Sequence, residues 1–150
     1  MTGFFDIEPL RQHVEQQVTA LREVGTASGL AKALASQAPA VPAAYLYVRT
    51  ERSRAQRGTA GSSRRTDVVV GVAIVVLDVR ASRRGAGEPD ELVTLRNAVA
   101  QAIETYQLPP GTGGPLMHEN GGIAETGDDQ ITVWEDTYTM SYQGATRYGA

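Results

Sequence analysis

The chain has 150 residues, a net charge of −3 and no cysteine. The missing cysteines exclude a disulfide framework, a thiol nucleophile and cysteine zinc sites. The length fits one domain, 1–150, with a core that needs no metal or disulfide to hold it. The N-terminal stretch MTGFFDIEPL has acids where a signal peptide carries basic residues, so we expect the protein to be cytoplasmic when made.

The charge is distributed unevenly along the chain. From Arg49 to Arg84 there are nine arginines against three acids, whereas from Glu88 to Asp136 there are ten acids against Arg96 alone. Such polarity either reflects solvated faces or directs one surface toward a complementary one. All basic residues except Lys32 are arginine, which favours planar, bidentate contacts with carboxylate or phosphate.

Two helices are expected in the N-terminal third. Asp6 can cap the first, an amphipathic helix whose apolar residues recur at helical spacing. These residues are Ile7, Leu10, Val14, Val18 and Leu21. Ser28 can cap a second, alanine-rich helix that stops before Pro39.

The stretch Thr66 to Arg80, TDVVVGVAIVVLDVR, is predicted to be the central strand of the fold. Its apolar core is too short to span a membrane, and its valine content favours a strand. Both faces of the strand are apolar, so both need cover and the strand needs neighbours on both sides. The small residues Gly71 and Ala73 predict close approach by a bulky group, either a helix or another subunit.

The stretch Val41 to Thr50 alternates as a strand does and is expected to pair with the central strand. Between them, 51–65 is rich in arginine, glycine and serine and has no hydrophobic residue larger than alanine. We therefore expect a flexible basic hairpin loop there.

The C-terminal half predicts a third helix and two strands. Apolar residues from Leu92 to Tyr106 form one stripe of a helix that ends before Pro109 and covers one face of the sheet. A weak strand is expected in 115–125. A final strand is expected in 130–142, with Trp134, Tyr138, Met140 and Tyr142 on a buried face that also carries Asp136.

The residues offer little chemistry. The glycine-rich loop 111–114 lacks the lysine and the strand-to-helix context of a phosphate cradle. His118 and Glu119 with Asp128 and Asp129 are the best candidates for a cation site, but they lack ligand spacing and are expected to be solvated. We therefore predict no catalytic residue, metal or cofactor. The arginine-rich loop gives some support to nucleic-acid binding, against the acidic balance of the whole chain.

The order of these segments resembles the tail terminator, or tail completion, proteins of long-tailed, Mu-like siphophages. The likeness rests on the opening helix, VPAAYLYV before an arginine-rich loop, and the valine-rich strand. It continues with LVTLRNAVAQAIETYQLPP and the closing VWEDTYTMSY. The resemblance implies an α+β fold, with two or three helices on a mainly antiparallel sheet. It also implies a structural virion protein of the tail that does no catalysis.

Further implications of the resemblance concern assembly. Six copies would form a ring at the head-proximal end of the tail tube, ending tube polymerisation and joining the tail to head-completion or connector proteins. DNA would pass through the lumen without sequence-specific binding, and the ring would assemble in the host cytoplasm and be carried in the virion tail. The competing hypothesis is a nucleic-acid-binding protein that uses the arginine-rich loop. Opposite charged patches suit a head-to-tail ring, and the residues expected at the interface are Arg52, Arg54, Arg57, Arg64, Arg65, Glu119, Asp128 and Asp129.

Overall fold

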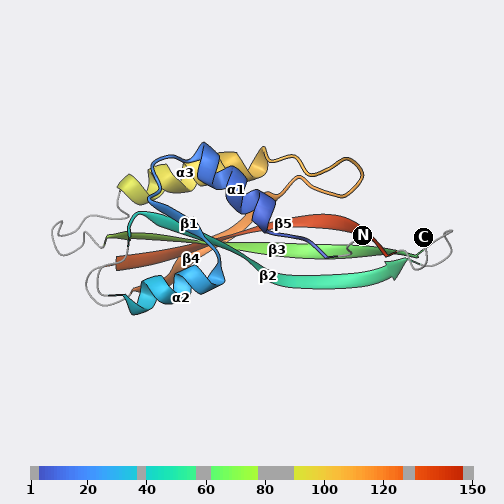
Figure 1. Cartoon of the computed structure of the whole chain (residues 1–150), viewed down its shortest axis with the longest axis horizontal. Helices are drawn as coiled ribbons and strands as arrows, with labels where there is room; N and C mark the ends of the chain where they lie inside the picture. The colour runs from blue at the N-terminus through green and yellow to red at the C-terminus, as the bar shows by residue number, and fades with distance from the viewer. Residues whose placement is uncertain (1–3, 37–39, 57–61, 78–89, 127–130, 147–150) are drawn as a thin grey trace.

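The computed structural model describes residues 4–36, 40–56, 62–77, 90–126 and 131–146. The described residues form three helices and five strands (Figure 1). In chain order these are α1 (Glu8–Gln17), β1 (Glu23–Gly25), α2 (Ala27–Ala35), β2 (Ala43–Gln56), β3 (Ser62–Leu77), α3 (Asp90–Glu104), β4 (Met117–Thr126) and β5 (Ile131–Thr146).

The five strands form one sheet in the order β1-β2-β3-β5-β4. Strand β3 is central, with β2 and β5 antiparallel on its two sides, and β4 pairs antiparallel with β5. The short strand β1 is the exception, because it pairs parallel with β2. The predicted α+β class is confirmed, and so is the central position of the valine-rich strand.

Helices α1 and α3 lie side by side on one face of the sheet, and α2 lies on the other (Figure 1). On the first face the β3 side chains Val68, Val70, Val72, Ile74 and Val76 are all 0% exposed. Burial of each such side chain is worth about 1.5–3 kcal/mol. The helix stripes expected from the sequence supply the cover, since Leu10 and Val14 of α1 and Leu95 and Val99 of α3 belong to the same core.

The second face of the sheet is covered over only part of its length. A smaller core there joins Ala33 of α2 to Tyr45, Ala73, Val75 and Val133 of the strands. At the end of β3, Leu77 leaves 55% of its surface exposed. The expectation from the sequence that both faces need cover is met on the first face, whereas the single chain covers the second face only in part.

The bulky group beside Gly71 is Tyr47 of β2. The sequence had suggested a helix or another subunit in this place. Tyr47 is the direct cross-strand partner of Gly71, and a Cβ at Gly71 would stand 2.5 Å from the tyrosine ring. The Tyr47 hydroxyl donates a hydrogen bond to Glu135, which holds the ring across the strand. Glycine at position 71 makes room for a ring that lies flat over β3.

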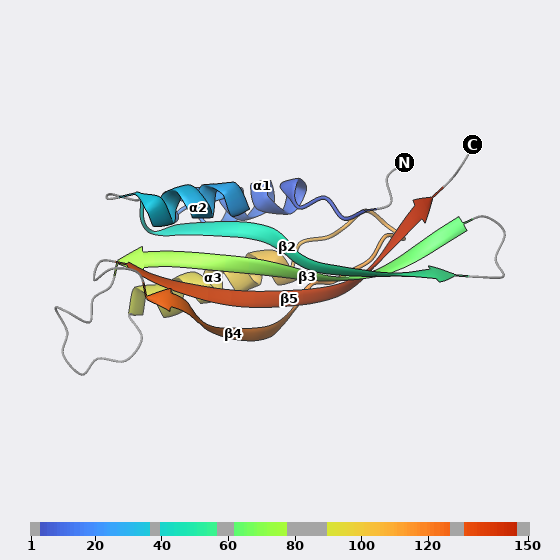
Figure 2. The same ribbon diagram turned by 90° about the horizontal axis from the view of Figure 1, so that it is seen from below.

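The basic stretch 51–65 is strand at all of its described residues, 51–56 and 62–65, which corrects the predicted loop. Strand β2 runs to Gln56, and β3 begins at Ser62 with Arg54 opposite Arg65. Together with the end of β5, these residues form what we call the sheet extension: 52–56, 62–67 and 141–146. Figure 2 shows it continuing beyond the helices. The remaining residues, 57–61, lie outside the described part of the chain.

Apart from Tyr142, whose ring packs against Phe5, the extension has no large apolar side chain, and it forms because strand pairing uses backbone groups. Each added residue pair exchanges N–H and C=O groups with a ladder that the core already aligns. Strand β3 also gains a partner on each side, since Ser63 pairs with Gln56 of β2 and with Ala145 of β5. Strand β5 accordingly extends past its predicted end at Tyr142.

Other boundaries shift by a few residues. Helix α1 ends at Gln17, although Val18 and Leu21 beyond it are still buried. Its N-cap is Ile7, whereas the Asp6 carboxylate accepts a hydrogen bond from the Glu8 backbone N–H. The α2 helix begins after Thr26 instead of Ser28.

Candidate functional site

Three arginines of the sheet extension, Arg52, Arg54 and Arg65, share one face. The register places Arg52 opposite Asp67 and Arg54 opposite Arg65, and residues that lie directly opposite across two strands point to the same side. This is the side that α2 covers elsewhere on the sheet. Arg52, Arg54 and Arg65 are all exposed there.

The pairing of Arg54 with Arg65 sets two positive charges against each other, which is unfavourable in a strand pair. Asp67 compensates only weakly, because its carboxylate lies 3.9 Å from Arg54 and both side chains are more than half exposed. Such exposed ion pairs contribute about 0–1 kcal/mol. Arg65 donates from Nε to the Ser141 hydroxyl at 2.9 Å. This face therefore gains from an anionic partner.

The other expected interface residues lie elsewhere or outside the described residues. Arg57, Asp128 and Asp129 belong to segments that are not described, and Arg64 lies in β3 with its side chain outside the description. Glu119 is exposed on β4, at a bulge between His118 and Asn120. That bulge lies beside Tyr138, whereas Arg65 pairs with Gln143, which is roughly 17 Å further along β5. The fold thus separates Glu119 from the arginines of the same copy.

A cation site is not formed by the residues that are described. His118 contacts Asp136 instead, since its Nε2 lies 2.8 Å from Asp136 Oδ1. Among the described histidines and acids, no group of three or more is placed to hold a metal ion. This part of the chain therefore offers no geometry for metal chemistry.

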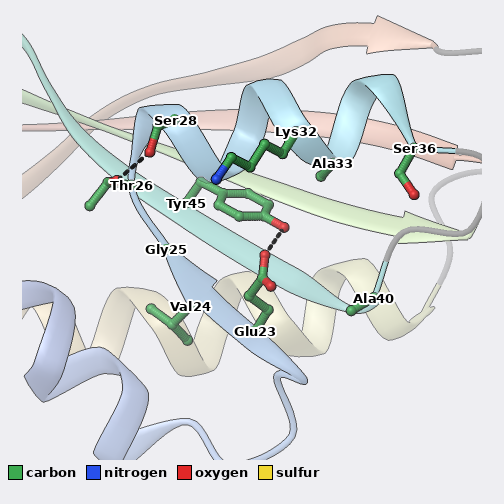
Figure 3. A pocket seen from close by; sticks show the side chains of 11 residues that line it. Glu23, Val24, Gly25, Thr26, Ser28, Lys32, Ala33, Ser36, Ala40 and Tyr45 are labelled. Carbon is green, nitrogen blue, oxygen red and sulfur yellow. Dashed lines mark hydrogen bonds between the residues drawn. The ribbon is translucent and has the colours of Figure 1, made fainter.

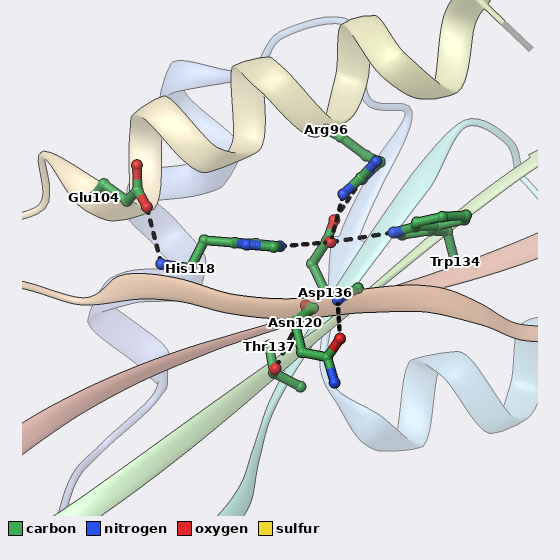
Figure 4. Close-up of polar contacts among 8 residues, drawn as sticks. Arg96, Glu104, His118, Asn120, Trp134, Asp136 and Thr137 are labelled. Atoms are coloured by element: carbon green, nitrogen blue, oxygen red, sulfur yellow. Dashed lines mark hydrogen bonds and ion pairs between the residues drawn. The ribbon is translucent and has the colours of Figure 1, made fainter. Parts of the chain in front are cut away.

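The most connected polar group in the structure is Asp136, which lies on the core side of β5 and is 2% exposed (Figure 4). Arg96 of α3 donates to its two carboxylate oxygens at 2.9 and 3.0 Å. The Trp134 indole donates to it at 3.1 Å, and the Arg96 guanidinium also lies 4.4 Å from the centre of the Trp134 ring. We call Arg96, His118, Trp134 and Asp136 the Asp136 cluster.

Burial opposes ionisation of Asp136, but the hydrogen bonds from Arg96, His118 and Trp134 outweigh it. The pKa of this carboxyl consequently lies below its ordinary value of 3.8. The cluster joins α3 to β4 and β5, and the Glu104 carboxylate extends it by accepting the His118 backbone N–H at 2.9 Å. It therefore serves as a clamp between the helix and the edge of the sheet.

Sequence reasoning missed the Asp136 cluster, although two signals pointed to it. Asp136 falls on the aromatic face predicted to be buried, and a buried carboxylate needs a partner. Arg96 is the only basic residue between Glu88 and Asp136. Combining the two would have paired residues that lie far apart in the chain.

A pocket of about 530 Å³ opens between α2 and the first two strands (Figure 3). The Tyr45 ring lies within it and donates a hydrogen bond of 2.5 Å to Glu23. A Cβ at Gly25 or at Gly29 would stand 3.0 Å from that ring, so glycine at both positions lets the helix lie close to it. The pocket lies where α2 packs against the edge of the sheet.

These features define an α+β domain with two charged surfaces and a structural clamp. Within the described residues, no helix has the length and apolarity needed to cross a membrane. The profile of the family described as phage tail terminator protein matches residues 1–147. The chain belongs to that family, and it is a structural protein of a phage tail.

Two further comparisons were made with known proteins. A chain from a solved structure titled "Virion of native gene transfer agent (GTA) particle" is 14% identical. It covers 94% of this chain and 100% of its own length, with a TM-score of 0.49. No curated protein matched.

Proposed function

We propose that the protein forms a ring that caps the head-proximal end of the tail tube. Membership of the tail terminator family, over residues 1–147, is the observation that carries this proposal. The ring stops the addition of tube subunits and presents a surface to the head-completion or connector proteins. DNA passes through its lumen without sequence-specific contacts. The protein does this by binding, not by catalysis.

The distribution of charge supports a ring built from head-to-tail contacts. In such a ring each copy uses two different surfaces, one for each neighbour. The sheet extension carries exposed Arg52, Arg54 and Arg65, whereas Glu91 of α3 and Glu119 of β4 are exposed on the body. Placement of opposite charges on separate parts of one chain favours contact between copies over contact within one copy. Arg57, Arg64, Asp128 and Asp129 are proposed to add to the same two surfaces.

Deletion of the gene tests the capping role. A terminator must bind the tube end more favourably than the next tube ring does, so its loss leaves the tube free to grow. We expect electron micrographs of the deletion phage to show heads separate from tails, with tails that are overlong or variable in length. Normal tails joined to full heads would contradict the proposal.

The exposed arginines of the extension also support a second candidate function, nucleic-acid binding. Arginines two residues apart on one strand lie about 6.6 Å apart and can contact a phosphate backbone. Negative-stain microscopy of the purified protein separates the two candidates. Rings or capped tubes support the terminator, whereas DNA retention that weakens with salt, without rings, supports the alternative.

A further inference from the structure

Four side chains of α3, β4 and β5 form a partly exposed cluster beside Asp136. Ile123 of β4 is 57% exposed and is the direct cross-strand partner of Trp134. Arg96 lies over the Trp134 ring, and Val93, one helical turn earlier on α3, is 40% exposed. We call Val93, Arg96, Ile123 and Trp134 the α3–β4 patch.

The α3–β4 patch is held rigid from below. Asp136 accepts both hydrogen bonds of the Arg96 guanidinium and the bond from the Trp134 indole, so both large side chains are fixed before any partner arrives (Figure 4). Gly121 leaves the room for this, because a Cβ there would stand 2.2 Å from the Asp136 carboxylate. Rigid tryptophan and arginine side chains are the residues that most often dominate binding at protein interfaces.

The two elements that carry Val93, Arg96 and Ile123 also carry exposed acids, Glu91 on α3 and Glu119 on β4. An apolar centre with carboxylates beside it suits arginine in particular, because the methylene stem packs on apolar surface while the guanidinium pairs with an acid. Exposed arginines gather on the sheet extension, which projects past the helices (Figure 2). Of the other exposed arginines that the structure describes, Arg49 pairs with Glu135 and Arg22 lies just before β1.

We propose that the α3–β4 patch is the surface on which the sheet extension of a second copy docks. The inference rests on the proposed ring and identifies the two surfaces that meet in it. Arg52 and Arg54 of one copy lie over Ile123 and Val93 of the next, with their guanidinium groups toward Glu91 and Glu119. Each copy offers its extension to one neighbour and its patch to the other.

The absence of cysteine from the chain allows a direct test by cross-linking. Two variants are prepared, Arg54→Cys and Ile123→Cys, and each is assembled alone and in an equal mixture under mild oxidation. The mixture is expected to form a disulfide between the two variants, whereas neither variant alone forms one. If the mixture assembles into rings without that disulfide, the docking inference is wrong and the ring proposal stands.

A substitution on the patch provides a second readout, with a matched control on the same strand. Ile123→Lys is expected to weaken self-association at least about tenfold in analytical ultracentrifugation, because it replaces an apolar side chain of the patch by a positive charge that repels the docking arginines. Met117→Lys is the control, since Met117 is 52% exposed on β4 but pairs with Thr139 on the opposite face of the sheet. Equal association of the two variants, at wild-type strength, would overturn the inference. A wild-type protein that forms no assembly would overturn the ring proposal as well.

Discussion

Asp136 shows how a single charged residue is kept in an apolar layer. A carboxylate that is 2% exposed is costly unless it is paired, and here Arg96, His118 and Trp134 supply the partners. Removal of one member of such a group costs more than the group contributes as a whole, because the others are left unpaired. The cluster therefore makes the attachment of α3 to the sheet edge depend on one residue.

Replacement of Asp136 by asparagine tests this dependence. Asp136→Asn keeps the size of the side chain and removes the charge that Arg96 faces. We expect the free energy of unfolding to fall by about 2–3 kcal/mol, a value reduced because the Arg96 side chain is 26% exposed. Urea denaturation followed by the fluorescence of Trp134, the single tryptophan, measures it. Asp67→Asn is the control, since its partly exposed pair with Arg54 is worth less than about 1 kcal/mol.

The difference in stability between the wild-type protein and Asp136→Asn is predicted to depend on pH. The folded pKa of Asp136 lies below the ordinary 3.8, so the unfolded chain binds the proton more readily. The stability that this carboxylate contributes is fully present above the ordinary pKa and is lost as the pH falls through the folded pKa. The difference between wild type and Asp136→Asn should shrink on acidification below pH 3.8. A difference that stays constant down to the folded pKa would show that the charge of Asp136 does not stabilise the fold.

At the scale of the elements, β3 is central to the fold, because β2 and β5 pair with it and the helices pack on its two faces. One edge strand of the sheet, β4, is interrupted by two bulges, which discourage pairing with other sheets. At the opposite edge β1 pairs only with Ala43 to Tyr45, so the described part of β2 beyond Tyr45 has β3 as its one strand neighbour. The assembly proposed above uses the side chains of the extension.

The burial of β3 predicts that a charge on its covered face prevents folding. Val72 is 0% exposed and lies directly between Leu46 of β2 and Asp136 of β5. Val72→Asp would bury an unpaired carboxylate beside a second one, at a cost of several kcal/mol. We expect no soluble folded protein, as judged by circular dichroism and size-exclusion chromatography. Val69→Asp, on the opposite and less covered face, should fold, and a native melting temperature for Val72→Asp would contradict the assignment of the core.

For the whole molecule, the charged extension predicts that assembly fails when its sign is reversed. Exposed pairs contribute only about 0–1 kcal/mol each, so several must act together. The triple change Arg52→Glu, Arg54→Glu and Arg65→Glu should leave the melting temperature within a few degrees and abolish incorporation into rings or tails.

Pelleting of complemented phage tails, followed by detection of the protein, measures this incorporation. The control changes Arg22 and Lys32 to glutamate, two exposed basic residues outside the extension. We expect the control to be incorporated normally. Incorporation of the triple variant at the wild-type level would remove the role proposed for these arginines.

The amino-acid sequence by itself determined the central strand, the amphipathic faces of α1 and α3, and the aromatic face of β5. Hydrophobic periodicity is a local property, and burial follows it directly, as the β3 residues Val68 to Val76 show. The order of these segments was also enough to indicate the family that the profile match then established.

Tertiary structure alone decided the rest, because the remaining features depend on residues distant in sequence. The stretch 51–65 has the composition of a loop, yet alignment with β5 continues much of it as strand. Arg96 and Asp136 lie 40 positions apart and meet only because α3 packs on the face of the sheet that carries Asp136. The ring of Tyr47 occupies the space over Gly71 because register sets them opposite each other. Backbone pairing and cross-strand register leave no local pattern in the chain, so only the folded sheet reveals them.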